Sequence, residues 1–310
     1  MIMHRSDPTL AIRALRSAAP YIRMYKGKTF VVKAGGGVFA EASSTRTLVE
    51  QIAILHYFGV RVVLVHGGGP QLSALADALG IPARLVGGRR ITDERTLEVT
   101  TMVLNGLINT RVLAICRALD IEAVGISGVD AGLVRARRRP PAPVEGSATP
   151  VDFGFVGDIE AVDPTVLLKL LDSGLMPVVS PLSADAAGTL LNINADTVAA
   201  ALGAALAAEK LILCTGAPGI LGDPRDPGSL ISYTDLQGLA RLRAEGRIAD
   251  GMLPKARAIE AALRGGVGRV HVVSYHSGEG ILGEVFTNEG TGTLIVADVN
   301  ALTPAEQSAT

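Results

Sequence analysis

Short apolar runs alternate along the chain with longer segments that have helical periodicity. The runs are apolar at nearly every position rather than at every second one, and they occupy residues 29–34, 61–65, 122–126, 176–180, 210–214, 269–274 and 293–297. Strands of this composition are covered on both faces, which is typical of a mostly parallel sheet. Between them, apolar residues recur every three or four positions at 45–59, 70–80, 94–120 and 254–266. The sequence therefore predicts an α/β fold with a mostly parallel sheet between layers of helices.

Two stretches interrupt this alternation. Residues 136–157 are rich in proline, glycine and serine, which predicts a protruding hairpin or loop. Turn residues at 180–188 separate two halves that are each rich in strand and helix patterns, so a domain junction is expected there.

The composition narrows the classes of function. With 310 residues, 48% of them hydrophobic, the chain can bury the core of two domains or of one large domain. A net charge of -1 and a pI of about 6.5 give no reason to expect a nucleic acid or a membrane as partner. The basic run at 135–139 leads into prolines, so a solvated loop explains it.

The cysteines and the chain start indicate a reduced, cytoplasmic protein. Cys116 and Cys214 are far apart in apolar surroundings, and neither a CxxC motif nor a His/Cys metal spacing occurs, so no resident metal is expected. The first ten residues have no apolar signal region, and the longest apolar run, at 197–208, is too short to span a membrane.

Two loops of three glycines each follow a predicted strand. The first, at 35–37, is separated from Lys33 by the single residue Ala34, and the second, at 67–69, is followed by Pro70. Proline at the first helical position and exposed backbone N–H groups form a cradle for an anion. Either loop alone is explained by a tight turn between strand and helix. Both together, with a lysine that is costly to bury without a negative partner, favour an anion site.

Common motifs for other phosphate and hydrolase chemistry are missing. The GKT at 27–29 resembles the end of a Walker A motif, but Ile22 stands where its first glycine belongs and a strand follows. No GxGxxG follows a strand, and neither HExxH nor GxSxG occurs.

The second half of the chain contributes a carboxylate and a second lysine. Asn192, Asn194 and Asp196 precede or enter an alanine-rich helix, where each alone is explained as a helix cap. Lys255 lies in the first turn of another predicted helix, where the helix dipole is unfavourable to a cation unless an anion is near.

These motifs resemble those of a known family. VVKAGGG, VLVHGGGPQL, NINAD and GMLPK occur in order within residues 29 to 297, and they resemble the acetylglutamate kinases of the amino-acid kinase superfamily. RSAAPYIRMYKGKTFVV and RVHVVSYHSGEGILGEVF are also similar to the amino-acid kinase module of N-acetylglutamate synthases.

The resemblance implies transfer of the γ-phosphoryl group of ATP to the side-chain carboxylate of N-acetyl-L-glutamate in arginine biosynthesis, with Mg²⁺ held mainly by the nucleotide. It implies that Lys33 and Lys255 are the catalytic lysines and that Asp196 holds them. The substrate-binding residues would be Gly67, Gly68, Arg90 and Asn192. Those along the nucleotide would be Gly35, Gly36, Thr215, Gly216, Gly219 and Met252. Residues 28–184 would bind the amino-acid substrate and 185–300 the nucleotide, with 301–310 as a tail.

The same resemblance implies regulation through residues 1–27. Asp7 and Pro8 are suited to start a helix in which Ala11, Leu15, Ala18 and Ile22 form an apolar stripe, although Pro20 should kink it. Packing on its own domain would explain the stripe. In arginine-sensitive relatives such a helix instead joins dimers into a hexamer, and L-arginine binds beside it as an inhibitor. The matching positions here are Tyr21, Lys210, His271, Glu284 and Gly290.

The chain also departs from the family pattern, and this leaves alternatives open. Gly216 stands where an acidic residue near the nucleotide is usual, and Val129 where a lysine is frequent. A kinase of a carrier-bound aminoadipate or glutamate would use the same residues. An arginine-binding regulatory module of an N-acetylglutamate synthase would not need both lysines and Asp196.

Overall fold

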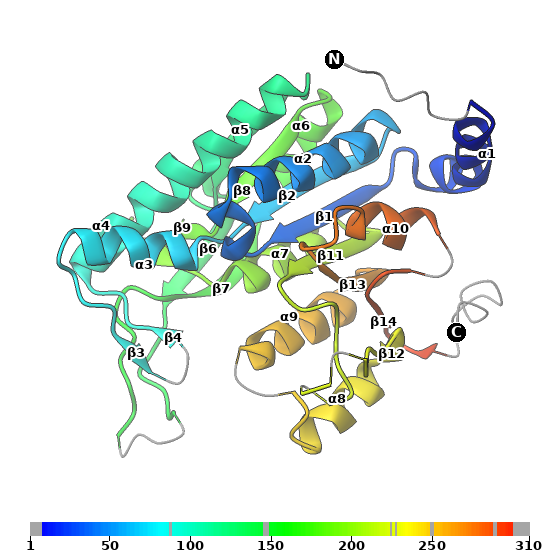
Figure 1. Ribbon diagram of the computed structural model, residues 1–310. Coiled ribbons are helices and arrows are strands. Elements are labelled where there is room, and N and C mark those ends of the chain that lie inside the picture. Colours follow the sequence, from blue (N-terminus) through cyan, green and yellow to red (C-terminus); the bar gives the residue numbers. More distant parts are fainter. Residues whose placement is uncertain are drawn as a thin grey trace.

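A computed structural model describes residues 8–86, 89–144, 149–223, 225–226, 228–248, 251–287 and 290–299. Its centre is an eight-stranded sheet with the order β12-β14-β13-β11-β1-β2-β8-β5 (Figure 1). The strands are β1 (Thr29–Ala34), β2 (Arg61–His66), β5 (Ala123–Ser127), β8 (Met176–Ser180), β11 (Lys210–Thr215), β12 (Tyr233–Asp235), β13 (Arg269–Ser274) and β14 (Thr293–Val296).

The sheet is mostly parallel, as the sequence predicts. Strand β1 is central, and its residues pair in parallel with β2 on one side and with β11 on the other. Strand β14 runs antiparallel to its neighbour β13, and β12 pairs in parallel with β14, so these two strands at one edge run opposite to the other strands of the sheet. The apolar run at 122–126 is the outermost strand, β5, and it is only partly buried, because an edge strand has a neighbour on one side alone.

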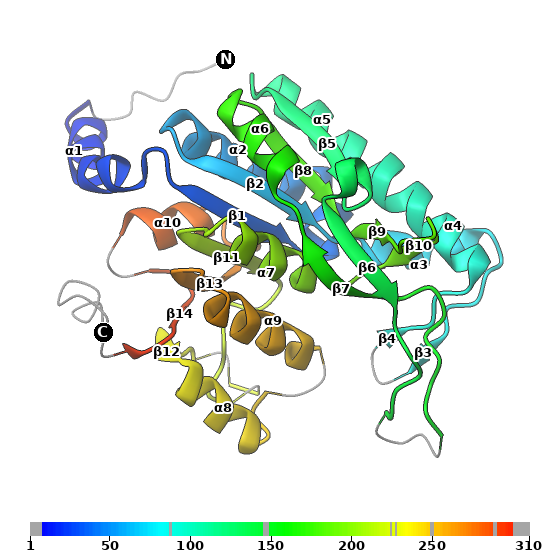
Figure 2. The same cartoon turned by 180° about the vertical axis from the view of Figure 1, so that it is seen from behind.

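Helices cover both faces of the sheet (Figures 1 and 2). Alternate residues of β1 point to opposite sides, so that Phe30 and Val32 enter one buried cluster and Val31 enters the other. The first cluster is closed by α2 (Ala42–Tyr57), α3 (Gly69–Ala78), α4 (Glu94–Thr101), α5 (Asn109–Ala118) and α10 (Gly280–Phe286). The second is closed by α6 (Thr165–Asp172), α7 (Ala195–Ala205), α8 (Leu236–Ala244) and α9 (Met252–Arg264). The predicted α/β architecture is confirmed.

A π-helical segment, η2 (Met102–Ile108), joins α4 to α5. The combined helix, Glu94–Ala118, is long and apolar enough to cross a membrane by length and composition alone, but 44% of its most apolar part is buried inside the protein. Because this helix packs on α2 and β5 as part of a helix layer, its apolar residues are explained by the fold.

A smaller four-stranded sheet, β10-β9-β6-β7, lies beside the carboxyl end of the main sheet. Its strands are β6 (Val134–Arg138), β7 (Gly157–Val162), β9 (Leu182–Ala184) and β10 (Leu190–Asn192). The segment between β6 and β7 projects from the molecule next to the two-residue strands β3 (Leu85–Val86) and β4 (Arg89–Arg90), as Figure 2 shows. The protruding hairpin predicted at 136–157 is therefore present.

The N-terminal helix α1 (Pro8–Tyr25) lies at the periphery (Figure 1). Its last turn is anchored, because Tyr25 is buried against Phe30 and Tyr21 meets Phe286 edge-on. Its earlier turns are not covered, and the side chain of Leu15 is 59% exposed. Pro20 lies inside the helix, whereas Asp7 and the side chain of Ala11 fall outside the described part of the chain.

Candidate active site

Lys33 lies near the carboxyl end of β1, and its neighbours on both sides are buried strands. Lys33 is only 7% exposed. The apolar residues that precede Lys33 hold the strand in place. The ammonium group of Lys33 therefore lies at the end of the sheet where both glycine loops begin. Ligands of open parallel sheets bind at this edge.

The two glycine loops touch each other. A Cβ atom on Gly36 would lie 2.6 Å from Cδ of Pro70 and 3.1 Å from Cα of Gly68. Gln71 ties the loops together, since its Nε2 donates to the carbonyl of Gly36 at 2.9 Å. Glycine is therefore required by this close approach, and the loops form one continuous backbone surface.

Asp196 joins the two lysines. Its Oδ1 lies 2.8 Å from Nζ of Lys33, and both of its oxygens lie 3.2 Å from Nζ of Lys255. The carboxylate comes from the first turn of α7, where Asn194 is the N-cap and accepts from the N–H groups of Asp196 and Thr197. Lys255 comes from the first turn of α9, and Asp196 is the anion that this unfavourable position requires.

The charges in this triad are strongly coupled. Burial acts to raise the pKa of Asp196, but the charges of Lys33 and Lys255 and their hydrogen bonds outweigh it, so the pKa lies below its usual value. Burial, together with the nearby charge of Lys33, lowers the pKa of Lys255. Two cations thus share one carboxylate, which leaves a net positive charge for an incoming anion.

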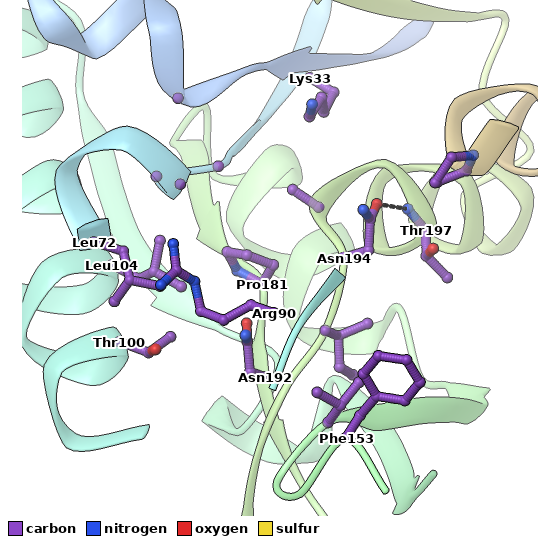
Figure 3. Close-up of a pocket in the computed structure, with 18 of the residues that line it drawn as sticks. Lys33, Leu72, Arg90, Thr100, Leu104, Phe153, Pro181, Asn192, Asn194 and Thr197 are labelled. Carbon is purple, nitrogen blue, oxygen red and sulfur yellow. Dashed lines mark hydrogen bonds between the residues drawn. The ribbon is translucent and has the colours of Figure 1, made fainter. Parts of the chain in front are cut away.

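A cavity of about 570 Å³ opens beside the triad (Figure 3). It brings together the predicted residues Lys33, Gly36, Gly67, Gly68, Arg90 and Asn192. Leu104, Thr100 and Phe153 also line it, and so do Arg139 and Arg257. Segments from the two halves of the chain therefore enclose one site.

Arg90 enters the cavity from β4. Its Nη2 donates to Oγ of Ser73 at 2.6 Å, while Nη1 is buried without a hydrogen-bond partner among the described residues. Burial lowers the pKa of Arg90, although the charge of Asp77 acts against this. A guanidinium with a buried and unused donor is suited to bind a carboxylate.

Asn192, the last residue of β10, faces the same space. Its Nδ2 donates to Oγ1 of Thr92 at 3.3 Å, which fixes the orientation of the amide. The asparagine is thereby held beside Arg90 as a second polar group in the cavity (Figure 3).

The remaining residues expected along the nucleotide lie outside this cavity. These are Gly35, Thr215, Gly216, Gly219 and Met252. Gly216 lies next to the side chains of Tyr275 and His276, and a Cβ there would lie 3.3 Å from the Tyr275 hydroxyl. Gly219 is enclosed by Thr293 and Leu230, so packing already accounts for it.

Several site residues were not predicted. Ser73 accepts a hydrogen bond from Arg90, and Gln71 donates one to the Gly36 carbonyl. Gln71 could have been found from the sequence, because it belongs to the HGGGPQL motif. Phe153 reaches the cavity from the projecting hairpin. No sequence pattern distinguishes this aromatic residue from a loop residue, since only the fold brings the hairpin over the site.

The predicted regulatory residues gather in a second, smaller pocket. It has a volume of about 90 Å³, and its lining includes Tyr21, Lys210, His271, Glu284 and Gly290. Lys210 Nζ lies 2.9 Å from Nε2 of His271, and Nδ1 of His271 lies 2.8 Å from Oε1 of Glu284. The pocket lies between α1, β11, β13 and α10, away from the first cavity.

The side chains of this second pocket have displaced pKa values. Burial, assisted by the charge of Lys210, lowers the pKa of His271 to about 4. Burial acts to raise the pKa of Glu284, but the hydrogen bond from His271 and two backbone N–H groups bring it down to about 2. At neutral pH, His271 is therefore neutral and donates to an ionised Glu284.

The fold and this site define a class of protein. A family model described as the amino acid kinase family matches residues 28–274. The chain belongs to the amino acid kinase family. Within it, the chain is 50% identical to the acetylglutamate kinase of Myxococcus xanthus (strain DK1622) over 296 residues, which cover 94% of this chain and 96% of that one. It is 44% identical over 282 residues to the acetylglutamate kinase of Symbiobacterium thermophilum, covering 91% and 96%. The predicted resemblance is confirmed.

Solved structures agree with this assignment. The N-acetylglutamate synthase of Neisseria gonorrhoeae, complexed with coenzyme A and L-arginine, has a TM-score of 0.80 and 28% identity. The match covers 93% of this chain and 65% of the synthase. A carbamate kinase from Giardia lamblia bound to AMP-PNP has a TM-score of 0.62 at 17% identity, covering 88% of this chain and 99% of that one, and shares the fold.

Proposed function

We propose that the protein transfers the γ-phosphoryl group of ATP to the side-chain carboxylate of N-acetyl-L-glutamate, as an acetylglutamate kinase of arginine biosynthesis. The observation that carries this proposal is the Lys33–Asp196–Lys255 triad, whose Lys33 lines the same cavity as Arg90. The identity of 44–50% to acetylglutamate kinases extends over more than 90% of the chain. It does not favour a kinase of carrier-bound aminoadipate or a regulatory module of a synthase.

The reaction requires charge neutralisation and positioning rather than a general base. A carboxylate is already a nucleophile, but it must approach a phosphoryl group that is also negative. Lys33 and Lys255 lower this repulsion, and Asp196 holds them in fixed positions so that they need not reorganise during the reaction. The backbone N–H groups at the start of α3 add donors without adding a mobile side chain.

The donor set fits a nucleotide that brings its own metal. In the described part of the chain no three His, Cys, Asp or Glu side chains form a metal-binding group. Lysines and glycine N–H groups instead suit phosphate oxygens. Mg²⁺ bound to the nucleotide would shield the charge of the phosphates. Among the residues described, Asp196 is the only carboxylate that contacts both lysines.

We assign the substrate carboxylate that does not react to Arg90 and Asn192. Figure 3 shows these two side chains on one side of the cavity and Lys33 on another, so a substrate with two carboxylates would span the space between them. In this scheme residues 28–184 supply most substrate contacts, and 185–300 supply Asp196, Lys255 and the loops after β11 and β13.

The test is ATP-dependent acyl-phosphate formation, trapped with hydroxylamine. We expect hydroxamate to form with N-acetylglutamate and not, at equal concentration, with glutamate or aminoadipate. Equal hydroxamate from aminoadipate would contradict the substrate assignment. A protein that forms none with any of the three would contradict the kinase reaction itself.

Replacement of Arg90 by lysine is expected to raise KM for N-acetylglutamate about tenfold or more while kcat changes little. Lysine keeps the charge but cannot bind Ser73 and a carboxylate at the same time in a planar fork. Steady-state kinetics with both substrates measure this, with the exposed Arg84→Lys as the matched control. An unchanged KM for Arg90→Lys would place the substrate carboxylate elsewhere.

We also propose that L-arginine inhibits the enzyme by binding in the second pocket. The support is that all five expected residues line one space, in which Glu284 offers a carboxylate to a guanidinium and Lys210 and Arg269 offer positive charge to a carboxylate. Helix α1 forms one wall through Tyr21 and Tyr25. Its uncovered apolar side chains, Ile12 and Leu15, are 52% and 59% exposed, which suits contact with another copy of the chain.

Deletion of residues 1–18 is expected to give active dimers that arginine does not inhibit, whereas the intact protein is an arginine-inhibited hexamer. This deletion removes Ile12 and Leu15 but keeps Tyr21 and Tyr25, whose packing on Phe286 and Phe30 supports the domain. Light scattering and kinase rates measure both effects, and Leu15→Glu tests the apolar face without shortening the chain. Only dimers from the intact chain, with unchanged rates in arginine, would contradict the proposal.

A further inference from the structure

His66 is a fully buried histidine directly before the second glycine loop. It ends β2, and its Nδ1 lies 3.3 Å from the carbonyl oxygen of Gly67. Its Nε2 lies 3.2 Å from Nδ2 of Asn109, an amide nitrogen that also donates to the carbonyl of Val178 at 3.0 Å. The Val178 carbonyl can only accept a hydrogen bond, so the Asn109 atom beside it is the amide nitrogen, which can only donate. The Nε2 atom of His66, which contacts the same nitrogen, must therefore accept. The ring proton therefore sits on Nδ1 and is donated to Gly67.

The partner of His66 is itself fixed. Asn109 follows the π-helical segment η2, and a Cβ on Gly125 would lie only 1.9 Å from its Oδ1, so glycine at 125 makes room for the amide. Burial lowers the pKa of His66 to about 4, which keeps the ring neutral and able to accept from Asn109. The network is therefore preorganised at neutral pH.

The same helix also confines Gly68. A Cβ on Gly68 would lie 2.6 Å from Cδ1 of Ile108 and 2.8 Å from Cδ2 of Leu104, both in η2. The peptide group between Gly67 and Gly68 is thus held at its carbonyl by His66 and at its following Cα by η2. π-Helical segments of this kind are frequent at functional sites.

We propose that His66 and Asn109 are positioning residues that aim the Gly68 N–H into the active-site cavity, where it donates to an oxyanion of the reacting group. In a planar trans peptide the N–H points opposite to the carbonyl. With the Gly67 carbonyl turned toward His66, the N–H of Gly68 points away from the ring, and Gly68 is a residue that lines the cavity. This inference rests on the proposed kinase reaction, in which negative charge must be met by fixed donors.

Two substitutions of His66 separate positioning from packing. In His66→Asn the side-chain amide takes the place of Nδ1 and can still donate to Gly67, whereas in His66→Gln it reaches only toward Asn109. We expect His66→Gln to lower kcat about a hundredfold, the effect of losing one preorganised donor, with KM for ATP unchanged. His66→Asn should keep most of the wild-type kcat, although it leaves more empty space in the core.

A variant outside the histidine provides a second test. Asn109→Ala should lower kcat about tenfold, as loss of a supporting partner does. The control is Asn105→Ala. Asn105 is an exposed residue of η2 that accepts a hydrogen bond from Ser180 and has none with His66. Thermal melting of each variant accompanies the kinetics.

The outcomes distinguish this inference from the proposed function. Equal kcat losses in His66→Asn and His66→Gln, or an Asn109→Ala variant with wild-type kcat, would overturn the positioning role. Wild-type protein that forms no hydroxamate from N-acetylglutamate would overturn the proposed reaction instead. If neither His66 variant folds, the Asn109→Ala result decides.

Discussion

Alanine in place of either Lys33 or Lys255 is expected to lower kcat by about two to three orders of magnitude, the range for loss of one preorganised charged group. The side chains of Lys33 and Lys255 are only 9% and 12% exposed, and each ammonium group lies within 3.2 Å of Asp196, so its position is fixed before substrate binds. Lys33 is the one lysine among the described residues that lines the cavity, and Lys255 lies behind it at Asp196, so no third lysine can take the place of either. The hydroxamate assay under saturating substrates measures the effect.

The two variants should differ from a surface control. Lys28→Ala removes a lysine next to the opposite end of β1, where it pairs with Glu209 at 3.8 Å and is largely exposed. We expect Lys28→Ala to retain wild-type kcat, because an exposed ion pair contributes little. A Lys33→Ala or Lys255→Ala protein with near-wild-type turnover would remove that lysine from the mechanism.

The parts of the site that the sequence revealed are those that depend on local patterns. Lys33 and the glycine loops adjoin apolar strands, so their place at the carboxyl edge of the sheet follows from the run of residues around them. Lys255 could be singled out because a lysine in a first helical turn is unfavourable alone. Its partner Asp196 was also visible, but the contact between them depends on how α7 packs against α9.

Other features depend on tertiary structure and left no local signal. The direction of β14 is one example, because an apolar strand of four residues has the same composition whether it is parallel or antiparallel. The partners of Arg90 and His66 are another, since Ser73 and Asn109 are 17 and 43 residues away from them. The apolar stripe of α1 was predicted, but whether Leu15 is covered depends on neighbours that the sequence does not specify.

Asp196→Asn is expected to abolish most activity and also to destabilise the protein. Asparagine has the same shape but no charge, so it leaves two ammonium groups, with side chains only 9% and 12% exposed, without their shared carboxylate. Removing one partner from a buried ion pair costs about 3 kcal/mol of unfolding free energy or more. Denaturant unfolding measures this, and kcat should fall together with stability because the lysines lose their fixed positions.

An added anion should distinguish this charge effect from a packing defect. Inorganic phosphate can supply the negative charge that the variant lacks, so it should raise the melting temperature of Asp196→Asn more than that of the wild type. Asp152→Asn is the matched control, because Asp152 pairs with Arg138 at 3.0 Å on the exposed hairpin and its loss should change stability by less than about 1 kcal/mol. A variant that unfolds like the wild type, and gains nothing extra from phosphate, would show that the two lysines do not depend on Asp196 for charge compensation.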